Sequence, residues 1–337
     1  MKIAIVNPSD EIELGVKGGN QYIAESLGKY IKKYTKHQVM VINTPFKHYP
    51  LLSLLKSYLL HRIIDLSNFD LVISLKFPSY MIKHHNHICY FAHFYRQFYD
   101  LWPQYPHKNI KIRLVRMFIR YLDKRALKKT KKIYAYSKTI QERLQEIGID
   151  AELLYVAPPE ENFSCKKFDY ILSPSILDDK RKRISLLIKA MRHIKHDTKL
   201  IIVGTGPHEK ELKMLAKKDS RILFVGYKTP EELVKLYQNA LCTCIVSHKE
   251  DYGLVTIESM KSKKPVITCI DSQGPLEFVE DEKTGLISKP DPESIARKLN
   301  YYIENKKQAK IMGKNAYQKV KEINWKNTLQ GLLNDKK

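Results

Sequence analysis

The sequence predicts an α/β protein with two doubly wound domains, each built on a parallel sheet. Short apolar segments alternate with helical patterns along the chain, an alternation typical of parallel strands covered by helices on both faces. The segments form two sets of six, and 337 residues are enough for two domains. Hydrophobic residues make up 43% of the chain, so each domain can build a core.

The predicted strands are short apolar runs. Six fall in the first half of the chain: Lys2–Val6, Val39–Ile42, Asp70–Leu75, His87–Tyr90, Ile133–Ala135 and Glu152–Val156. Six more fall in the second half: Tyr170–Leu172, Lys199–Val203, Ile222–Val225, Leu241–Val246, Pro265–Thr268 and Gly285–Ile287. Ligands of such sheets bind beyond the carboxyl ends of the strands. We therefore expect the functional residues in the loops that follow the strands, at a cleft between the domains.

A linker separates the two sets of strands. The segment from Ala157 to Asn162 contains paired prolines, which cannot continue a strand and favour extended backbone. After the last predicted strand, apolar residues recur at helical spacing from about Lys307 to Leu333. We therefore predict a first domain at 1–160, a second at 161–306 and C-terminal helices at 307–337.

The chain is strongly basic, with a formal net charge of +23. Such a protein should bind an anionic partner, and nucleic acid, an anionic membrane and phosphorylated substrates all qualify. The segment from Lys108 to Lys132 contributes eleven Lys or Arg and one acid, Asp123. Apolar residues recur within it at helical spacing between arginines: Ile112, Val115, Ile119 and Leu122. This pattern predicts either a core helix with a basic outer face or a helix at a membrane interface.

The cysteines and the hydropathy of the chain indicate a cytoplasmic protein. There are five cysteines, an odd number, and no Cys-x-x-Cys motif, so neither a disulfide framework nor a zinc site is predicted. No stretch reaches the ~18 uncharged apolar residues of a membrane span. The N-terminus also lacks the pattern of a signal peptide.

The most informative segment carries two glutamates eight positions apart. Glu250 falls in a polar segment after the strand Leu241–Val246, and Glu258 falls about one turn into the helix that Gly253 opens. Free N–H groups at a helix N-terminus can bind a phosphate, and a carboxylate can accept hydrogen bonds from a ribose. The segment therefore predicts a protein that holds a nucleotide diphosphate by its backbone and a sugar by a carboxylate.

A resemblance to a known family rests on the same segment. The pattern Glu250, seven residues, Glu258, with Gly253-Leu254 inside it and Pro265-Val266-Ile267 after it, resembles the retaining glycosyltransferase family 4, of the glycosyl transferases group 1. The resemblance implies the GT-B fold, in which two Rossmann-like domains face a central cleft. It also implies that the first domain binds the acceptor, that the second binds the nucleotide sugar, and that the last helix packs back on the first domain.

The implied activity is the transfer of a sugar, with retained anomeric configuration, from a UDP- or GDP-linked donor to a glycan or lipid-linked acceptor. Surface polysaccharide, glycolipid or glycoprotein glycan synthesis is the implied setting. Glu258 would hold ribose hydroxyls, and Glu250 would lie near the donor sugar or hold its loop. The amides of Gly253, Leu254 and Val255 would contact sugar or phosphate.

A basic loop from Asp178 to Arg183 holds the candidate diphosphate ligands. In the family an arginine and a lysine stabilise the charge of the leaving group. Counting back from Leu186 puts Lys182 at the family lysine, whereas counting forward from the preceding strand favours Arg181. The family arginine has no counterpart at its expected place, so Arg181, Lys182 or Arg183 must substitute for it.

Two glycine turns and a histidine segment complete the candidate site. Gly18-Gly19 follows the first strand, and Gly204-Thr205-Gly206 follows the second strand of the second domain. Each is either a close approach to the ligand or a plain turn into a helix. His93 and Arg96 follow the fourth strand in a segment similar to a family motif. There His93 is either a structural histidine or a contact to the donor sugar or acceptor hydroxyl.

Other functions agree less well with the motifs of the sequence. The main alternative, motivated by the charge, is a non-enzymatic protein that binds nucleic acid or another anionic polymer, but no zinc-finger or RRM signature occurs. A nucleotide-sugar epimerase or NAD-dependent dehydrogenase needs a complete glycine fingerprint and an acid after the second strand, where Asn43 stands. No Asp-x-Asp motif occurs, so we expect no cofactor and no obligatory metal. The expected partners are a nucleotide sugar, its acceptor and an anionic membrane at its cytoplasmic face, without nucleic acid.

Overall fold

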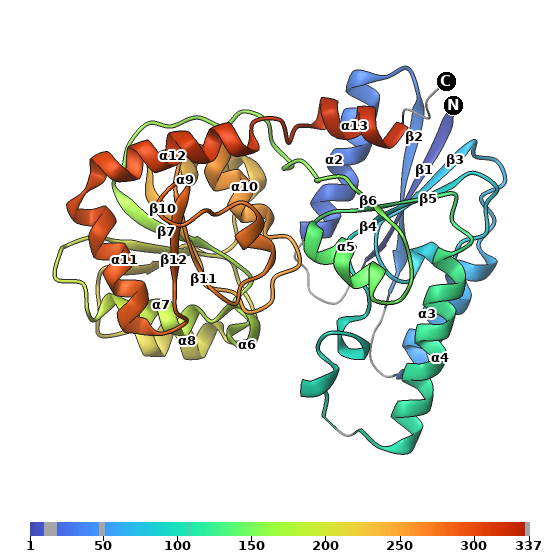
Figure 1. Ribbon diagram of the computed structural model, residues 1–337, viewed down its shortest axis with the longest axis horizontal. Coiled ribbons are helices and arrows are strands. Elements are labelled where there is room, and N and C mark those ends of the chain that lie inside the picture. Colours follow the sequence, from blue (N-terminus) through green and yellow to red (C-terminus); the bar gives the residue numbers. More distant parts are fainter. Residues whose placement is uncertain (10–18, 47–50, 107, 334–337) are drawn as a thin grey trace. The chain divides into compact units, whose positions relative to one another are not determined.

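The structure consists of two compact units, which are described separately (Figure 1). It is a computed structural model that describes residues 1–9, 19–46, 51–106 and 108–333. The first unit contains Met1–Ala157 and Trp325–Lys337, and the second contains Pro158–Asn324. The chain thus leaves the first unit inside the proline linker and returns to it after Asn324. The sequence pattern alone places these boundaries after residues 160 and 306.

The first unit is built on a six-stranded parallel sheet. Its strands are β1 (Lys2–Ser9), β2 (Gln38–Pro45), β3 (Leu71–Ser74), β4 (His87–Phe91), β5 (Lys132–Ala135) and β6 (Glu152–Leu153), in the order β2-β1-β3-β4-β5-β6. β1 is paired on both sides, and its Ile3 lies opposite Val39 of β2 and Leu71 of β3. The predicted strands of the first half are confirmed.

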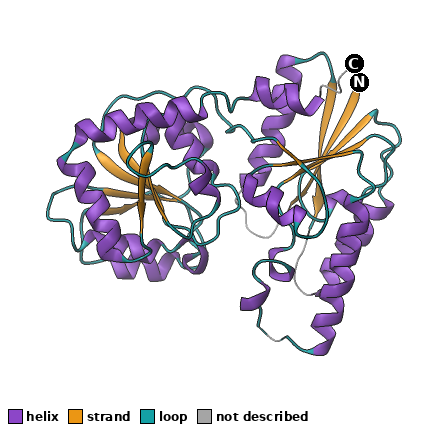
Figure 2. Cartoon of the chain, in the orientation of Figure 1, coloured by secondary structure: helices purple, strands orange, loops and turns teal. Residues whose placement is uncertain are grey.

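Helices flank this sheet (Figure 2). They are α2 (Gly19–Tyr34), α3 (Leu51–Ile63), α4 (Ile110–Leu127), α5 (Lys138–Gln145) and α13 (Trp325–Leu333), with the 3-10 turns η1 (Ser79–Met81), η2 (Arg96–Phe98) and η3 (Trp102–Gln104). The buried Trp325 of α13 stacks on Tyr30 of α2, with ring centroids 5.2 Å apart. The Tyr134 hydroxyl also donates to the Gly331 carbonyl at 2.7 Å. The C-terminal helix therefore belongs to the core of the first unit.

The second unit repeats this architecture. Its strands are β7 (Tyr170–Pro174), β8 (Leu200–Val203), β9 (Ile222–Phe224), β10 (Ala240–Ile245), β11 (Val266–Cys269) and β12 (Gly285–Ser288), parallel and in the order β12-β11-β10-β7-β8-β9. Its helices are α6 (Asp179–Lys182), α7 (Ile184–Met191), α8 (Glu209–Ala216), α9 (Pro230–Asn239), α10 (Leu254–Lys261), α11 (Pro292–Glu304) and α12 (Lys306–Val320), with the 3-10 turn η4 (Gly274–Glu277). The predicted strands of the second half are confirmed. Cys242 and Cys244 are free and buried in β10, as expected of core residues.

The helix α4 packs as a core helix, which is one of its two predicted structures. Ile119, one of the apolar residues at helical spacing, is fully buried. Arg116 and Arg120 both donate to the Phe98 carbonyl, at 2.9 and 3.4 Å. The side of α4 that carries Ile119 and the buried Asp123 therefore packs on the first unit, and its arginines hold the loop around Phe98. No described helix is long and apolar enough to cross a bilayer.

Asp123 is a fully buried carboxylate that three tyrosines surround. The hydroxyls of Tyr58 and Tyr80 donate to it at 2.8 Å and that of Tyr99 at 2.7 Å. Burial raises the pKa of Asp123 from its usual 3.8 to about 6, although the tyrosine hydrogen bonds lower it. The network ties α3, η1 and the loop after β4 to α4.

This network predicts a pH-dependent stability. Because the folded-state pKa of Asp123 is raised, its stabilising contribution is present below pH 3.8 and is lost as pH rises through about 6. As pH rises from 3.8 to about 6, the free energy of unfolding of Asp123→Asn should increase by about 2–3 kcal/mol relative to that of the parent protein. Urea titrations at several pH values measure this difference. An Asp65→Asn control, at an exposed carboxylate, should show no such gain. A constant difference between Asp123→Asn and parent at all pH values would contradict the prediction.

Candidate active site

Two neighbouring strands of the second sheet bring charged side chains to the same edge. β7 is followed by the loop into α6, and β10 by the loop into α10. Because β7 and β10 are adjacent and parallel, their loops leave the carboxyl edge of the sheet side by side. There the Lys182 ammonium donates to the Glu250 carboxylate and forms an ion pair. Two of the three residues predicted to be catalytic are thus in contact.

A further loop fixes the backbone of Glu250. The Glu250 N–H donates to the Ser272 carbonyl at 2.8 Å, and its carbonyl accepts from the Gly274 N–H at 2.9 Å. A Cβ at position 274 would lie 2.8 Å from the backbone of Tyr252, so glycine is needed for this close pairing. The Lys182 and Glu250 side chains are 22% and 23% exposed, which leaves both accessible to a ligand.

Arg183, the last cation of the basic loop, is used to hold that loop in place. Its guanidinium donates to both carboxylate oxygens of Asp271 at 2.7 and 2.8 Å. It also donates to the Val246 and Ser247 carbonyls at 2.6 and 3.0 Å. These bonds attach the start of α7 to the end of β10. Arg183 therefore positions its neighbour Lys182.

The other two candidate cations of the loop, Arg181 and Lys182, point to different partners. Arg181 donates to Asp178 at 2.6 Å, and its side chain is 55% exposed. Lys182 reaches across to Glu250. Of the three cations that the sequence left undecided, Lys182 is the one that the fold holds beside the glutamate segment.

The N-terminus of α10 lies directly after Glu250. Gly253 has a left-handed backbone with φ of +78°, and no side chain caps the helix. A Cβ at Gly253 would lie 2.9 Å from the Pro275 ring, so this turn requires glycine. The first N–H groups of a helix lack an intrahelical partner. The amides of Leu254 and Val255 are therefore candidates for binding an anion, close to Glu250 in the chain.

Glu258 lies farther along α10 and is buried, with 7% of its surface exposed. The Tyr237 hydroxyl of α9 donates to its carboxylate at 2.8 Å. Burial raises the pKa of Glu258 from its usual 4.5 to about 7, and the Tyr237 hydrogen bond opposes this shift. This raised pKa brings the ionisation of the Glu258 carboxyl close to neutral pH, and a carboxylate can accept hydrogen bonds from hydroxyl groups.

The turn at Gly204 and Gly206 packs against the loop that follows β7. A Cβ at Gly204, whose φ is +121°, would lie 1.9 Å from the Ser175 carbonyl oxygen. A Cβ at Gly206 would lie 2.7 Å from the backbone of Leu177. Both glycines therefore permit a close backbone approach that supports the basic loop, whatever contact they make to a ligand.

Substitution of these glycines should destabilise the second unit. Gly204→Ala combines a steric overlap with an unfavourable φ, so we expect a loss of about 2–4 kcal/mol in the free energy of unfolding. The matched control is Gly226→Ala, where φ is +69° but the space around the new Cβ is open. That change should cost only about 1–2 kcal/mol. Equal losses in urea titrations would show that the contact with Ser175 is unimportant.

The first unit places its candidate residues at the carboxyl edge of its own sheet. His93 follows β4, and its Nε2 lies 3.0 Å from the amide nitrogen of Asn20 at the start of α2. Its Nδ1 lies 2.9 Å from the Phe94 carbonyl oxygen. Gly19, the first residue of α2, is exposed and has open space around it. Gly18 lies outside the described residues. The start of α2 and the histidine segment are thus neighbours, linked by Asn20.

Arg96 belongs to a cluster of charges behind His93. Its guanidinium pairs with Asp100 at 2.5 Å, and Arg143 of α5 approaches the same carboxylate at 3.5 Å. The Asp100 carboxylate thus links Arg96 of η2 to Arg143 of α5. A ligand contact for Arg96 stays a prediction.

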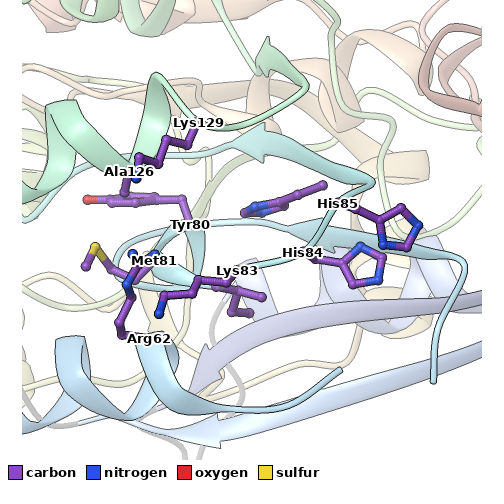
Figure 3. Close-up of a pocket in the computed structure, with 10 residues that line it drawn as sticks. Arg62, Tyr80, Met81, Lys83, His84, His85, Ala126 and Lys129 are labelled. Carbon is purple, nitrogen blue, oxygen red and sulfur yellow. The ribbon is translucent and has the colours of Figure 1, made fainter. Parts of the chain in front are cut away.

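A cavity of about 410 Å³ in the first unit holds none of the predicted site residues (Figure 3). It lies at the amino end of β4, whereas His93 lies beyond the carboxyl end. Its basic lining residues are Arg62, Lys83, His84, His85, His87 and Lys129. Burial lowers the pKa of His87 to about 4, so this histidine is neutral. Ligands of doubly wound sheets bind at the other edge, so this cavity is not the candidate active site.

Three residues of the site were not found by sequence reasoning. Tyr237 hydrogen-bonds Glu258 from a helix that precedes β10, and Asp271 neutralises Arg183 from the loop after β11. Asn20 was visible as the end of the glycine turn, but nothing in the sequence pairs it with His93. Each is defined by a contact between segments distant in the chain.

Comparisons with known proteins find glycosyltransferases. A model of the family described as Glycosyl transferases group 1 matches residues 160–319. An uncharacterized glycosyltransferase of Methanocaldococcus jannaschii is 28% identical over 227 residues, 63% of this chain and 61% of that protein. The α-1,3/1,6-mannosyltransferase ALG2 of Dictyostelium discoideum is 33% identical over 118 residues, 34% of this chain and 28% of ALG2. The chain thus matches less than two thirds of the length of these relatives.

The fold as a whole has counterparts among solved structures. The crystal structure of Anabaena HepE in complex with UDP and glucose has a TM-score of 0.72 and 16% identity, and the alignment covers 99% of this chain and 98% of HepE. The protein therefore has the GT-B fold, as the sequence predicts. Within that fold, residues 160–319 match the family described as Glycosyl transferases group 1.

Proposed function

We propose that the protein is a retaining glycosyltransferase that moves a sugar from a UDP- or GDP-linked donor to a glycan or lipid-linked acceptor. The observation that carries this proposal is one grouping in the second unit. Three features meet at the start of α10: the Lys182–Glu250 pair just before the helix, the uncapped N-terminus of the helix, and the buried Glu258 within it. A cation, free amides and a carboxylate are the groups that suit a diphosphate, a sugar and a ribose. HepE, which shares the fold, binds UDP and glucose.

Lys182 is proposed to stabilise the leaving group. When the bond between the anomeric carbon and the phosphate oxygen breaks, negative charge develops on the diphosphate. An ammonium group held in place before the reaction stabilises that charge without reorganisation. Glu250 would orient Lys182 before the donor binds and lie beside the donor sugar afterwards. The proposed mechanism uses this cation and the α10 amides, and it needs no obligatory metal and no cofactor.

Retention is proposed to follow from attack on the same face that the diphosphate leaves. The acceptor oxygen bonds to the anomeric carbon as the phosphate oxygen departs, and the departing diphosphate takes the hydroxyl proton. The protein then supplies orientation and electrostatic stabilisation in place of a strong base. His93 is the proposed contact from the first unit, because it lies at the carboxyl edge of that sheet beside Asn20 and Gly19.

The acceptor is proposed to belong to surface polysaccharide, glycolipid or glycoprotein glycan synthesis. ALG2 is named as a mannosyltransferase, and the net charge of +23 favours an anionic or membrane-bound acceptor over a neutral free sugar. All five cysteines are free, which fits work in the cytoplasm at the membrane face.

The proposal is tested by sugar transfer itself. Purified protein is incubated with radiolabelled UDP- and GDP-sugars and with lipid and glycan acceptor fractions, and the linkage formed is assigned by proton NMR. Transfer from one donor class, with the anomeric configuration of the donor kept, is the expected result. Transfer with inversion would overturn the retaining mechanism. Salt-sensitive binding to nucleic acid without transfer from any donor would favour the non-enzymatic alternative.

A further inference from the structure

The helix α4 has a second apolar face, which is exposed. Its members are Ile110, Leu114, Met117, Phe118 and Tyr121, each between 53% and 68% exposed. Because an α-helix turns about 100° per residue, these positions form one stripe. The buried residues of α4 fall on the opposite side of the helix: Ile119, Asp123, Ala126 and Leu127. Single exposed apolar residues are ordinary, but a continuous stripe along an 18-residue helix calls for a partner.

Basic side chains border the stripe on both sides. Helical geometry places Lys111 along one side, and Arg113 and Lys124 along the other. Arg125 lies one turn beyond the stripe and donates to the Tyr121 hydroxyl at 2.9 Å. Asp123 is the one acidic residue of α4, and it is buried. The exposed surface of this helix therefore combines apolar side chains with cations and has no negative charge of its own.

This combination favours one kind of partner. A second copy of the chain would bring two rows of cations together, which costs binding energy. A neutral apolar groove would leave the cations without counter-charges. An anionic bilayer surface matches both parts, because apolar side chains enter the boundary of the acyl chains while Lys and Arg contact lipid phosphates.

We propose that α4 docks the protein on an anionic membrane through the stripe from Ile110 to Tyr121. The lipid is identified by its chemistry as a phospholipid with a net negative headgroup. The cavity lined by Arg62, Lys83 and Lys129 adds three further cations near the C-terminal end of α4. The surface differs from the stripe that the sequence pattern selects, since Ile119 of that pattern is buried.

The inference deepens the proposed function, on which it rests for the presence of a lipid-linked acceptor. Docking along one helix would hold the enzyme at the surface where such an acceptor is confined. Membrane binding is nevertheless measured without donor or acceptor, so it can fail or succeed independently of sugar transfer.

The test is flotation of the purified protein with vesicles of phosphatidylcholine, with and without phosphatidylglycerol. The parent protein should float with the anionic vesicles and remain behind with the neutral ones. Leu114→Ser combined with Phe118→Ser removes apolar surface without changing charge and should lower the partition coefficient by about tenfold or more. Lys111→Gln combined with Lys124→Gln removes two charges, one from each side of the stripe, and should lower the partition coefficient by roughly thirtyfold.

Matched controls separate docking from folding and from catalysis. Met214→Ser changes a 76% exposed apolar residue in the second unit and should float like the parent. The stripe variant should keep the parent's melting temperature and its stabilisation by nucleotide, since its side chains lie outside the core. If the stripe variant keeps its melting temperature and its stabilisation by nucleotide but no longer floats with the vesicles, docking is confirmed whatever the outcome of the transfer assay.

Three results would overturn the proposal. Equal recovery of the parent with neutral and anionic vesicles would remove the role of lipid charge. Flotation of the Leu114→Ser and Phe118→Ser variant at the parent level would remove the role of the stripe. A parent dimer in sedimentation equilibrium that this variant converts to a monomer would assign the stripe to self-association instead.

Discussion

Replacing Lys182 with alanine is expected to lower kcat for sugar transfer by about 10²–10³-fold. The side chain is held against Glu250 at the edge of the second sheet and is the cation of the basic loop best placed for a leaving diphosphate. Charge on that group is greatest in the transition state, so its loss should lower kcat more than it raises KM for the donor. Steady-state release of nucleoside diphosphate measures both parameters.

The neighbouring cation supplies a matched control for this experiment. Arg181 is one position away, is 55% exposed and donates to Asp178, so Arg181→Ala should keep kcat within a few-fold of the parent. Lys182→Arg should recover part of the activity, because it restores the charge with a different shape. Full activity in Lys182→Ala together with loss in Arg181→Ala would show that the register of the basic loop has been assigned to the wrong residue.

Replacing Glu258 with glutamine is expected to separate stability from binding. The pKa of this carboxyl is raised from 4.5 to about 7, so its stabilising contribution is present below pH 4.5 and is lost as pH rises through 7. At pH above 7 the parent carries a buried charge, and the variant should be more stable by about 1–3 kcal/mol. Nucleotide affinity should fall by about tenfold to a hundredfold, because charged hydrogen bonds to the ribose contribute about 1.5–3 kcal/mol.

The pH dependence of binding gives a second readout for Glu258. Affinity of the parent for a nucleotide sugar should rise with pH through 7, as the carboxyl ionises, whereas Glu258→Gln should bind equally at all these pH values. Glu293→Gln, at a carboxyl that is 60% exposed, should change neither stability nor affinity. If Glu258→Gln binds the nucleotide sugar as tightly as the parent at pH 8, Glu258 does not contact the ribose.

Much of the fold follows from local patterns in the chain. Parallel strands buried on both faces appear as short apolar runs, which is why β1 and β10 could be placed before the structure was known. The glutamate segment was equally clear, because Gly253 marks the turn and the spacing of Glu250 and Glu258 puts one residue before the helix and the other within it. These signals lie within single elements.

The remaining features depend on contacts between distant segments. Lys182 and Arg183 are adjacent cations, and only the position of Asp271 shows that one is structural. The pKa of Glu258 depends on burial beneath neighbouring helices, which no local spacing encodes. The exposed stripe of α4 was missed for a related reason. This helix is apolar on two sides, so its period does not reveal which side is buried.

The central claim is that the second unit binds a nucleotide diphosphate, and the most direct test is thermal unfolding with a panel of UDP, GDP, ADP and their sugars. A ligand that binds only the folded state at a hundred times its Kd adds about 2.7 kcal/mol of stability. We predict a rise in Tm with one uridine or guanosine series, reduced in Glu258→Gln. An unchanged Tm with every nucleotide would contradict the claim and leave the basic surface as the functional part of the molecule.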